Sequence, residues 1–326
     1  WNQVASFAGY AFAKGHSASY AVESYQSLFL RAYFPLEYLV AVLNNGGGFY
    51  RSEFYVHDAR MMGATIYPPC VNKSMAVNRI YGTHIYLGMM YLRDLESRVM
   101  ERILKERMLH GSFTSLEDFL DRVFIRMEQL SILIRIDAFR FTGINKHELL
   151  WKAHLMLSKN DRLEHPKLFP PRHQKFQMPQ LNTTALETAF EQWELLGFCL
   201  CSPFELLEET PKNSNGQKDL ERHLNKYIDI YGYLVTVKNT STHHGKRMHF
   251  ATLVDQHGEV FDTVLFPPVA AKYYFRGKGI YRFYGKVVEE FGFLSIEVIK
   301  MKKENYVQDP RYADMRMSKK LFDSKK

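Results

Sequence analysis

The sequence predicts a multidomain α+β protein, with an all-α N-terminal half followed by a five-stranded β-barrel. Apolar residues recur at helical spacing in successive segments as far as Leu196, whereas from Ile228 onward they alternate with polar residues, as in half-buried strands. The chain has 326 residues, which exceeds the usual size of a single hydrophobic core. Two or three domains are therefore expected.

A basic residue, an imidazole and a hydroxyl group stand at the start of the first predicted helix. Its apolar stripe runs from Ala18 to Ala32, so Lys14, His16 and Ser17 fall at the helix N-terminus. Free N–H groups and the helix dipole favour an anion there, which predicts a phosphate site. The alternative interpretation is that Ser17 only caps the helix.

The helices that follow are predicted from their caps and apolar stripes. Pro35 is a favoured first-turn residue, and Gly63 stands in a C-cap position. Thr114 and Glu117 have the spacing of a capping box, and Asn145 is placed as an N-cap. The predicted helices cover residues 35–45, 51–62, 91–107, the segment after the capping box, 127–136, 145–155 and 184–196, with a turn at 138–143.

Between residues 159 and 181 the composition shifts to prolines and basic residues with little periodicity, which predicts a linker. Leu168 and Phe169 form an apolar pair flanked by prolines. Short apolar anchors on a flexible strand dock into partner pockets, so this pair is a candidate docking peptide. The alternative is that it pins the linker to its own domain. A polar stretch at 210–218 predicts a further domain boundary.

Five segments with a period of two predict the strands, at residues 228–237, 248–255, 259–266, 279–288 and 294–301. Their number, with glycines at the corners, suits a small OB barrel, a fold that binds single strands by basic rims and aromatic faces. Phe250, Phe261 and Phe266 lie in the second and third strands, and the polar loop 240–247 favours contact with a nucleic-acid backbone. The candidate DNA-binding residues are Tyr231, Tyr233, Lys238, Lys246, Arg247, Arg276 and Lys278. For any one aromatic residue the alternative is a place in the core.

The block Phe7-Ala-Gly-Tyr-Ala-Phe-Ala-Lys14-Gly-His16-Ser17 resembles the fingers of the bacterial C-family replicative DNA polymerases, the alpha subunits of DNA polymerase III. The resemblance continues nearly end to end, through residues 33–43, 53–60, 68–72, 111–119 and 194–198 and a barrel-like region. It implies that Lys14 and His16, with Ser17 beside them, approach the triphosphate or sugar of an incoming nucleotide. Ala13 and Gly15 replace the Asn and Ser common in close relatives, so no contact is carried over for those two side chains.

The resemblance also implies the order of the domains. Residues 1–85 would be the end of the fingers, 86–158 a clamp-binding domain of tandem helix-hairpin-helix units, 159–182 a linker, 183–218 a helical connector, 219–307 the OB domain and 308–326 a charged tail. Family hairpins offer N–H groups to a DNA phosphate through Gly-Val-Gly, but this chain has Asp94-Leu95-Glu96. The two carboxylates and the lost close approach predict that this hairpin is mainly a packing element.

The resemblance implies single-stranded template and primer–template duplex, the sliding clamp and other replisome subunits as partners. Leu168 and Phe169 match the end of the family's internal clamp motif, although His165 replaces its Gln. The net charge of +8 and the pI near 9.1 favour a polyanionic partner. Three cysteines give neither a disulfide framework nor a zinc spacing, and no apolar run or signal peptide predicts a membrane, so a cytoplasmic location is expected.

No set of carboxylates suited to two magnesium ions is apparent, and the resemblance places the family's palm triad before Trp1. The segment is therefore expected to carry no catalytic or metal-binding residue and no cofactor of its own, with Mg²⁺ implied for the parent polymerase. Two alternatives remain: a free-standing DNA-binding adaptor built from helix-hairpin-helix and OB units, or a specialised lesion-bypass alpha paralogue. The block at 14–17 favours a polymerase over an adaptor.

Overall fold

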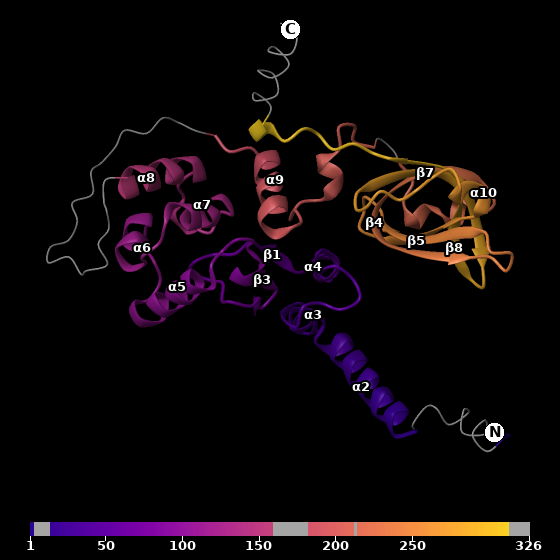
Figure 1. Cartoon of the computed structure of the whole chain (residues 1–326), viewed down its shortest axis with the longest axis horizontal. Helices are drawn as coiled ribbons and strands as arrows, with labels where there is room; N and C mark the ends of the chain where they lie inside the picture. The colour runs from indigo at the N-terminus through magenta and orange to yellow at the C-terminus, as the bar shows by residue number, and fades with distance from the viewer. Residues whose placement is uncertain (3–13, 159–181, 212–213, 313–326) are drawn as a thin grey trace, which may run out of the picture. The chain divides into compact units, whose positions relative to one another are not determined.

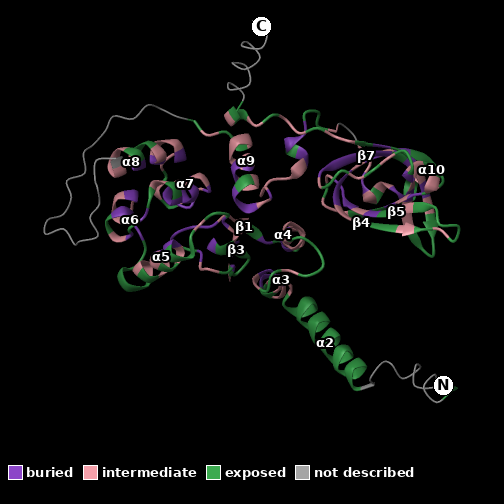
Figure 2. Cartoon of the chain, viewed as in Figure 1, coloured by how far each residue is buried: buried purple, intermediate pink, exposed green. Residues whose placement is uncertain are grey.

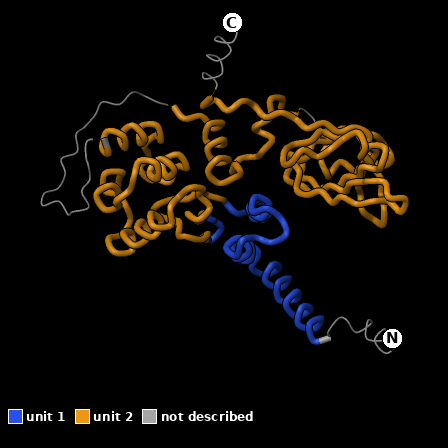
Figure 3. Tube along the Cα trace, in the orientation of Figure 1, with its two compact units in different colours: residues 1–65, 80–85 blue, residues 66–79, 86–326 orange. Residues whose placement is uncertain are grey.

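The computed structural model describes residues 1–2, 14–158, 182–211 and 214–312 (Figure 1). The chain divides into two compact units, one of residues 1–65 and 80–85 and one of residues 66–79 and 86–326 (Figure 3). The second unit includes both the helical region and the barrel, so the boundaries at 183 and 219 stay predictions. The candidate docking residues Leu168 and Phe169 lie outside the described residues.

The first unit is helical, with α2 (Lys14–Tyr33), α3 (Pro35–Asn44) and α4 (Ser52–Met61). The helix α3 begins with proline at its first position and buries Leu39 and Leu43. By contrast, α2 is exposed from Gly15 to Tyr33 (Figure 2), and its Arg31 pairs with Asp58 of α4 at 2.8 Å. Three short strands, β1 (Thr65–Tyr67), β2 (Arg79–Tyr81) and β3 (His84–Tyr86), form a sheet in the order β1-β3-β2.

The helical region of the second unit contains α5 (Ser97–His110), α6 (Leu116–Arg122), α7 (Met127–Arg135), α8 (Lys146–Ser158) and α9 (Ala185–Leu196). The predicted helices are confirmed, but α5 begins six residues later than predicted. The chain forms a 3-10 turn, η1 (Met89–Tyr91), and Asp94 then takes a left-handed conformation with φ of 64°. A helix cannot continue through such a residue, and aspartate is one of the few side chains that tolerate it.

The N-cap of α6 is Ser115, one residue later than the predicted Thr114, and Asp118 bonds to the residue before the cap. The Ser115 hydroxyl accepts a hydrogen bond from the Asp118 N–H at 3.1 Å, and the Asp118 carboxylate accepts one from the Thr114 N–H at 2.9 Å. The expected pair of Thr114 and Glu117 is therefore wrong, because Asp118 is the residue that reaches back to the start of the helix. At α9 the cap is Thr184, and Gly197 ends the helix in the left-handed region with φ of 90°.

The barrel is formed by β4 (Tyr227–Ser241), β5 (Arg247–Val254), β6 (Val260–Leu265), β7 (Ile280–Glu290) and β8 (Phe293–Lys303), with α10 (Pro267–Ala270) between β6 and β7. It closes in the order β4-β5-β6-β8-β7, in which β6 and β8 are parallel and the other pairs antiparallel. All five predicted strands are confirmed. This five-stranded closed barrel has the architecture of an OB fold.

Alternate residues of the strands fill the barrel interior. Ile228, Ile230, Leu253, Phe283 and Ile296 are buried completely or nearly so. Their neighbours in sequence must point outward, because successive side chains of a strand lie on opposite faces. Register therefore decides which side chains the barrel presents to its surroundings.

β4, the first strand of the barrel, is longer than predicted, so the loop after it is shorter than predicted. β4 continues to Ser241, and its last residues pair with Arg247 to Phe250 of β5. The predicted loop 240–247 is thereby reduced to a tight turn, closed by a hydrogen bond from the Thr242 N–H to the Lys246 carbonyl at 2.8 Å. Most side chains of residues 238–247 are exposed, so apolar and polar residues do not alternate and the pattern fails to reveal the strands.

Gly232 is a position where the barrel has no room for a side chain. A Cβ there would lie 2.6 Å from a ring carbon of Phe261 and 2.7 Å from the Cβ of Leu253. We therefore expect Gly232→Ala to lower the free energy of unfolding by about 1–3 kcal/mol through overpacking. Urea unfolding followed by circular dichroism would measure the change. Lys238→Ala, on the same strand but exposed, should shift stability by less than about 0.5 kcal/mol, and equal stability of both variants would contradict this packing.

Candidate nucleic-acid interface

The β4–β5 hairpin presents basic and aromatic side chains together. Lys238, Lys246 and Arg247 are exposed, and Phe250 is 43% exposed on β5. Lys238 and Phe250 are direct cross-strand partners, so they share the outward face. Arg247 has the side-chain direction of buried His249, so it lies at the end of the hairpin on the other face of β5 from the Phe250 ring. We call Lys238, Lys246, Arg247 and Phe250 the hairpin surface. A cation can bind a phosphate, and an exposed ring beside it can stack on a base.

Arg247 borders two hollows beside this hairpin. One is also lined by Lys246, Pro267 and Tyr274 and the other by Asn239, His249 and Tyr274. Tyr274 is exposed, and its hydroxyl donates a hydrogen bond to the Ala271 carbonyl at 3.0 Å. Sequence reasoning missed Tyr274, because it lies in the loop after α10 and outside the strand pattern.

His249 is a buried member of the second hollow. Burial, together with the charge of Arg247, lowers the pKa of this imidazole below its usual value. The ring is therefore neutral near pH 7, and the local positive charge comes from Arg247 and Lys246.

Two of the predicted DNA-binding residues are engaged in packing. Tyr233 is 6% exposed, so its ring cannot stack on a base and it does not belong to the interface. The ammonium group of Lys278 donates a hydrogen bond to the Gly197 carbonyl at 2.6 Å and lies 5.3 Å from the centre of the Trp193 ring. Its charge is thus directed to α9 and not to a phosphate, which corrects the prediction for this residue.

The other two candidates stay at the surface. Arg276 is exposed in a loop that Tyr281 holds in place, because the buried Tyr281 hydroxyl accepts from the Arg276 N–H at 2.8 Å and donates to the Gly277 carbonyl at 2.7 Å. Tyr231 is half-buried, and the Arg282 guanidinium lies 5.6 Å from its ring centre. Tyr231 therefore faces outward on β4, away from the hairpin surface's Phe250 on β5.

The first hairpin of the helix-hairpin-helix region uses its polar backbone groups internally. The Gln129 side chain accepts a hydrogen bond from the Glu96 N–H at 2.7 Å and donates one to the Asp94 carbonyl at 2.8 Å. The Glu96 N–H is thus not free to bind a phosphate, and the Asp94 and Glu96 side chains are exposed acids. This geometry favours the packing role expected from the sequence.

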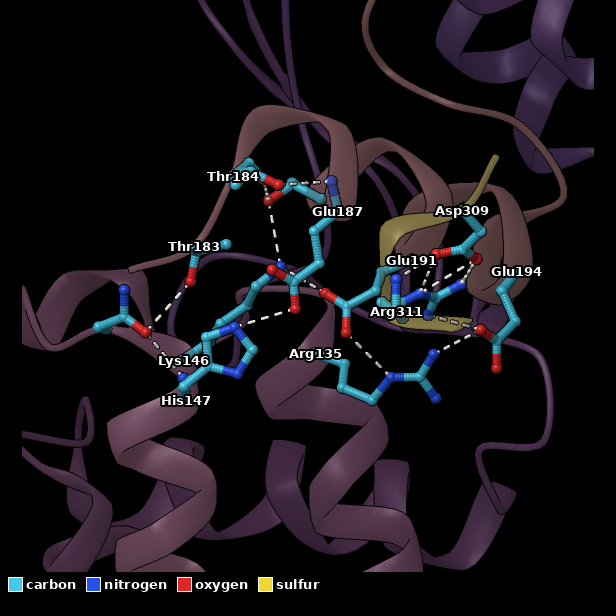
Figure 4. A network of polar contacts seen from close by, with 12 residues as sticks. Arg135, Lys146, His147, Thr183, Thr184, Glu187, Glu191, Glu194, Asp309 and Arg311 are labelled. Carbon is cyan, nitrogen blue, oxygen red and sulfur yellow. Dashed lines mark hydrogen bonds and ion pairs between the residues drawn. The ribbon is translucent and has the colours of Figure 1, made fainter. Parts of the chain in front are cut away.

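An ion network that is buried at Lys146 and Glu191 and exposed at Glu194 joins α7, α8, α9 and the segment around η6 (Pro310–Tyr312) (Figure 4). Glu191 of α9 is buried and accepts hydrogen bonds from Lys146 and, at 3.2 Å, from Arg135. Glu194, one turn later, binds Arg135 at 2.6 Å and Arg311 at 2.8 Å. The network fixes α9 to the helical region and leaves these cations no free charge for DNA.

The nucleotide-side candidates lie in the first turn of α2. The helix already includes Lys14, His16 and Ser17, so Ser17 is not its N-cap, and His16 and Ser17 are exposed. In the part of the chain that the structure describes, no three His, Cys, Asp or Glu side chains gather to hold a metal ion. Within the same residues, no helix has the length and apolar character to span a membrane.

Residues 63–149 match the family model described as "Helix-hairpin-helix motif". The DNA polymerase III subunit alpha of Treponema pallidum is 29% identical over an alignment of 287 positions that covers 80% of this chain and 24% of that protein. An error-prone DNA polymerase of Mycobacterium bovis is 31% identical over 156 residues, 47% of this chain and 14% of that protein.

The chain thus spans about a quarter or less of the length of these relatives. Among solved structures, the second OB-fold domain of replication protein A from Methanococcus maripaludis is 20% identical, covers 26% of this chain and 91% of that domain, and has a TM-score of 0.21.

The ion network gives the fold a dependence on pH. Burial acts to raise the pKa of Glu194, but hydrogen bonds from Arg135 and Arg311 lower it overall, and a hydrogen bond from Arg311 lowers the pKa of Asp309. Carboxyls with lowered folded-state pKa stabilise the protein above their ordinary pKa, about 4, and lose that contribution as the pH falls through the folded-state value. The free energy of unfolding should therefore fall below about pH 4.5.

Arg311→Met should lower the free energy of unfolding at pH 7 by about 1–3 kcal/mol, because it removes charged hydrogen bonds, and should make the decline in acid shallower. Urea unfolding at a series of pH values would measure both effects. Arg222→Met is the matched control, since Arg222 is exposed and reaches Asp219 only at 4.0 Å. An acid decline as steep in Arg311→Met as in the unchanged protein would show that the network does not carry the pH dependence.

Proposed function

Because the chain is related in sequence to the C-terminal region of bacterial DNA polymerase III alpha subunits and error-prone DNA polymerases, we propose that it is part of such a polymerase and binds single-stranded DNA through its barrel. The hairpin surface carries this proposal. Lys238, Lys246 and Arg247 supply charge for phosphates, and Phe250 supplies a ring for a base. The net charge of +8 favours the same partner.

Duplex contact is assigned to the helix-hairpin-helix region, but not to its first hairpin. The Glu96 N–H is bonded to Gln129, so the phosphate contact falls to the start of α5, where Arg98 is exposed. The helix α5 has no side-chain cap, and its Val99 N–H bonds to the Glu96 carbonyl, so the N–H groups of Ser97 and Arg98 would be the ones to meet an anion. Primer–template duplex would bind here through its backbone and without sequence preference.

The nucleotide-side role belongs to the start of α2 in the proposal. Lys14 would contact the triphosphate and His16 the sugar of the incoming nucleotide, with Ser17 beside them. The resemblance of the block around these residues to the fingers of the polymerase family supports this assignment. The parent polymerase would hold Mg²⁺ for nucleotidyl transfer, but the described residues of this chain form no metal-binding group, so no catalytic step is assigned to them.

Partners other than DNA belong to the same proposal. Leu168 and Phe169 would dock on the sliding clamp, and further replisome subunits would bind the parent. The chain matches relatives named as alpha subunits and relatives named as error-prone polymerases. The second form of the proposal is therefore that the parent protein is a lesion-bypass polymerase. A free-standing adaptor is less well supported, because the aligned part of the Treponema relative covers 80% of this chain as one continuous segment of a polymerase.

The salt dependence of single-strand binding tests the barrel. We expect a labelled oligothymidine to bind the chain with an affinity that falls steeply with salt, since phosphate contacts release counterions. Each cation removed should reduce the slope of log K against log salt by about 0.7, so Lys246→Ala with Arg247→Ala should reduce it by about 1.4. Phe250→Ala should weaken binding about tenfold through lost stacking.

Fluorescence anisotropy at several salt concentrations would measure these changes. Lys105→Ala removes one charge from an exposed lysine of α5; it is the control for removal of a cation outside the barrel and should leave the single-strand slope unchanged. Affinity that does not depend on salt, or variants of the hairpin surface that bind like the unchanged chain, would contradict the proposed interface.

The clamp contact is tested separately at the predicted docking peptide. Phe169→Ala should weaken binding to the sliding clamp by about tenfold or more, because burial of a phenylalanine side chain contributes about 1.5–3 kcal/mol. Surface plasmon resonance with immobilised clamp would measure the affinity. If Phe169→Ala and the unchanged chain bind the clamp equally, the clamp contact lies elsewhere.

A further inference from the structure

Three tyrosines and three cations share the outward face of strands β4, β7 and β8. Register places Tyr231, Arg282 and Lys302 in one row across the strands, and Tyr284 and Lys300 as partners in the next. Tyr227 begins β4 and lies diagonally from Tyr284, on the same side. We call Tyr227, Tyr231, Tyr284, Arg282, Lys300 and Lys302 the tyrosine face. Its residues lie on β4, β7 and β8, whereas Arg247 and Phe250 of the hairpin surface lie on β5.

The tyrosine face contains a stacked and exposed pair of rings. Tyr227 and Tyr284 have ring centroids 5.9 Å apart with an interplanar angle of 20°. Tyr227 is 56% and Tyr284 is 37% exposed. Their neighbours in sequence, Ile228 and Phe283, fill the barrel interior, so register fixes both tyrosines outside. The pair is thus a preformed aromatic platform on a rigid element.

The charge around this platform is positive. Arg282, Lys286, Lys300 and Lys302 lie on the outward face of β7 and β8, and the acidic residues beside them are Asp229, Glu297 and Glu304, so the cations exceed the acids by one. The Arg282 Nε donates to Asp229 at 2.9 Å, so this carboxylate is neutralised and holds the guanidinium over the Tyr231 ring.

Lys302 is 71% exposed and pairs with Glu304 at 2.9 Å. Surface pairs of this kind are weak and are readily exchanged for a phosphate. Lys300 is exposed beside Tyr284, its direct partner across the strands. A ligand on the tyrosine face would therefore contact tyrosine rings on β4 and β7 and lysine ammonium groups on β8.

We propose that the tyrosine face is a second binding surface for single-stranded nucleic acid, with successive bases stacked on Tyr227 and Tyr284 and the phosphates on Arg282, Lys300 and Lys302. The proposal rests on the proposed function, because it extends single-strand binding from the hairpin surface to another side of the same barrel. Stacked rings beside cations are the combination that binds single strands without sequence preference, and the excess of cations complements a phosphate backbone. A longer strand would then bind more tightly than one that reaches a single surface.

A crosslinking experiment on the unchanged full chain tests this placement. An oligothymidine carrying 5-iododeoxyuridine is irradiated in the complex, and the linked tryptic peptides are identified by mass spectrometry. We expect crosslinks at Tyr227 or Tyr284 in addition to the hairpin surface. Crosslinks at the hairpin surface alone would overturn the inference and leave the proposed function standing, whereas no complex at all would contradict both.

Matched variants provide the second measurement. Tyr227→Ala with Tyr284→Ala should weaken binding of the oligothymidine by about tenfold at low salt, whereas Tyr227→Phe with Tyr284→Phe, which keeps both rings, should bind within about twofold of the unchanged chain. Phe291→Ala is the control, because Phe291 is a fully exposed ring of the barrel outside both surfaces. Circular dichroism would verify folding of each variant, and the crosslinks on the unchanged chain decide the question if the alanine variant does not fold.

Two outcomes of this comparison would overturn the inference. One is an alanine variant that binds like the unchanged chain while Lys246→Ala with Arg247→Ala binds weakly, since the hairpin surface alone would then account for binding. The other is an equal loss in Phe291→Ala, since the effect would then not be specific to the tyrosine face.

Discussion

Closure of the barrel is the constraint on which the binding surfaces depend. Hydrogen bonding around the ring β4-β5-β6-β8-β7 fixes the register of each strand, and the apolar interior takes every second side chain. Exposed rings at the remaining positions therefore cannot be core residues. Two outward cross-strand pairs follow from this alternation. Phe250 of β5 lies beside Lys238, and Tyr284 of β7 lies beside Lys300. The barrel supplies rigid positions, and its outward residues supply the chemistry of single-strand binding.

The helical region meets a different constraint, which is the burial of charge. Lys146 and Glu191 are both almost fully buried, so each requires its partner and one additional hydrogen bond: Lys146 also donates to the Thr188 hydroxyl, and Glu191 also accepts from Arg135. This requirement fixes the orientation of α9 against α7 and α8. At the first hairpin, Gln129 similarly satisfies the backbone of Asp94 and Glu96. The cations of the ion network and the backbone groups of the first hairpin thus bind other groups of the protein. In the proposal, the duplex contact therefore lies at the start of α5.

The sequence was sufficient to predict the order of helices, the five strands and the barrel, because each has a clear period or cap. The sequence pattern did not predict which individual aromatic and basic residues are buried or engaged in packing. Tyr233 and Lys278 are an aromatic and a cation in the right domain, but Tyr233 is buried and the partly buried Lys278 donates its hydrogen bond to the Gly197 carbonyl. Tyr227 and Tyr284 were missed, although their alternation with Ile228 and Phe283 would have placed them outside the barrel. The extension of β4 to Ser241 was hidden because most side chains of the hairpin end are exposed.

Hydrogen exchange of the full chain with and without a saturating oligothymidine tests the central claim most directly, because it reports the backbone of every region in one measurement. The account predicts slower exchange at residues 238–250 of the β4–β5 hairpin and no change at residues 94–98 of the helix-hairpin-helix region. Slower exchange at residues 94–98 with none on the barrel would contradict it.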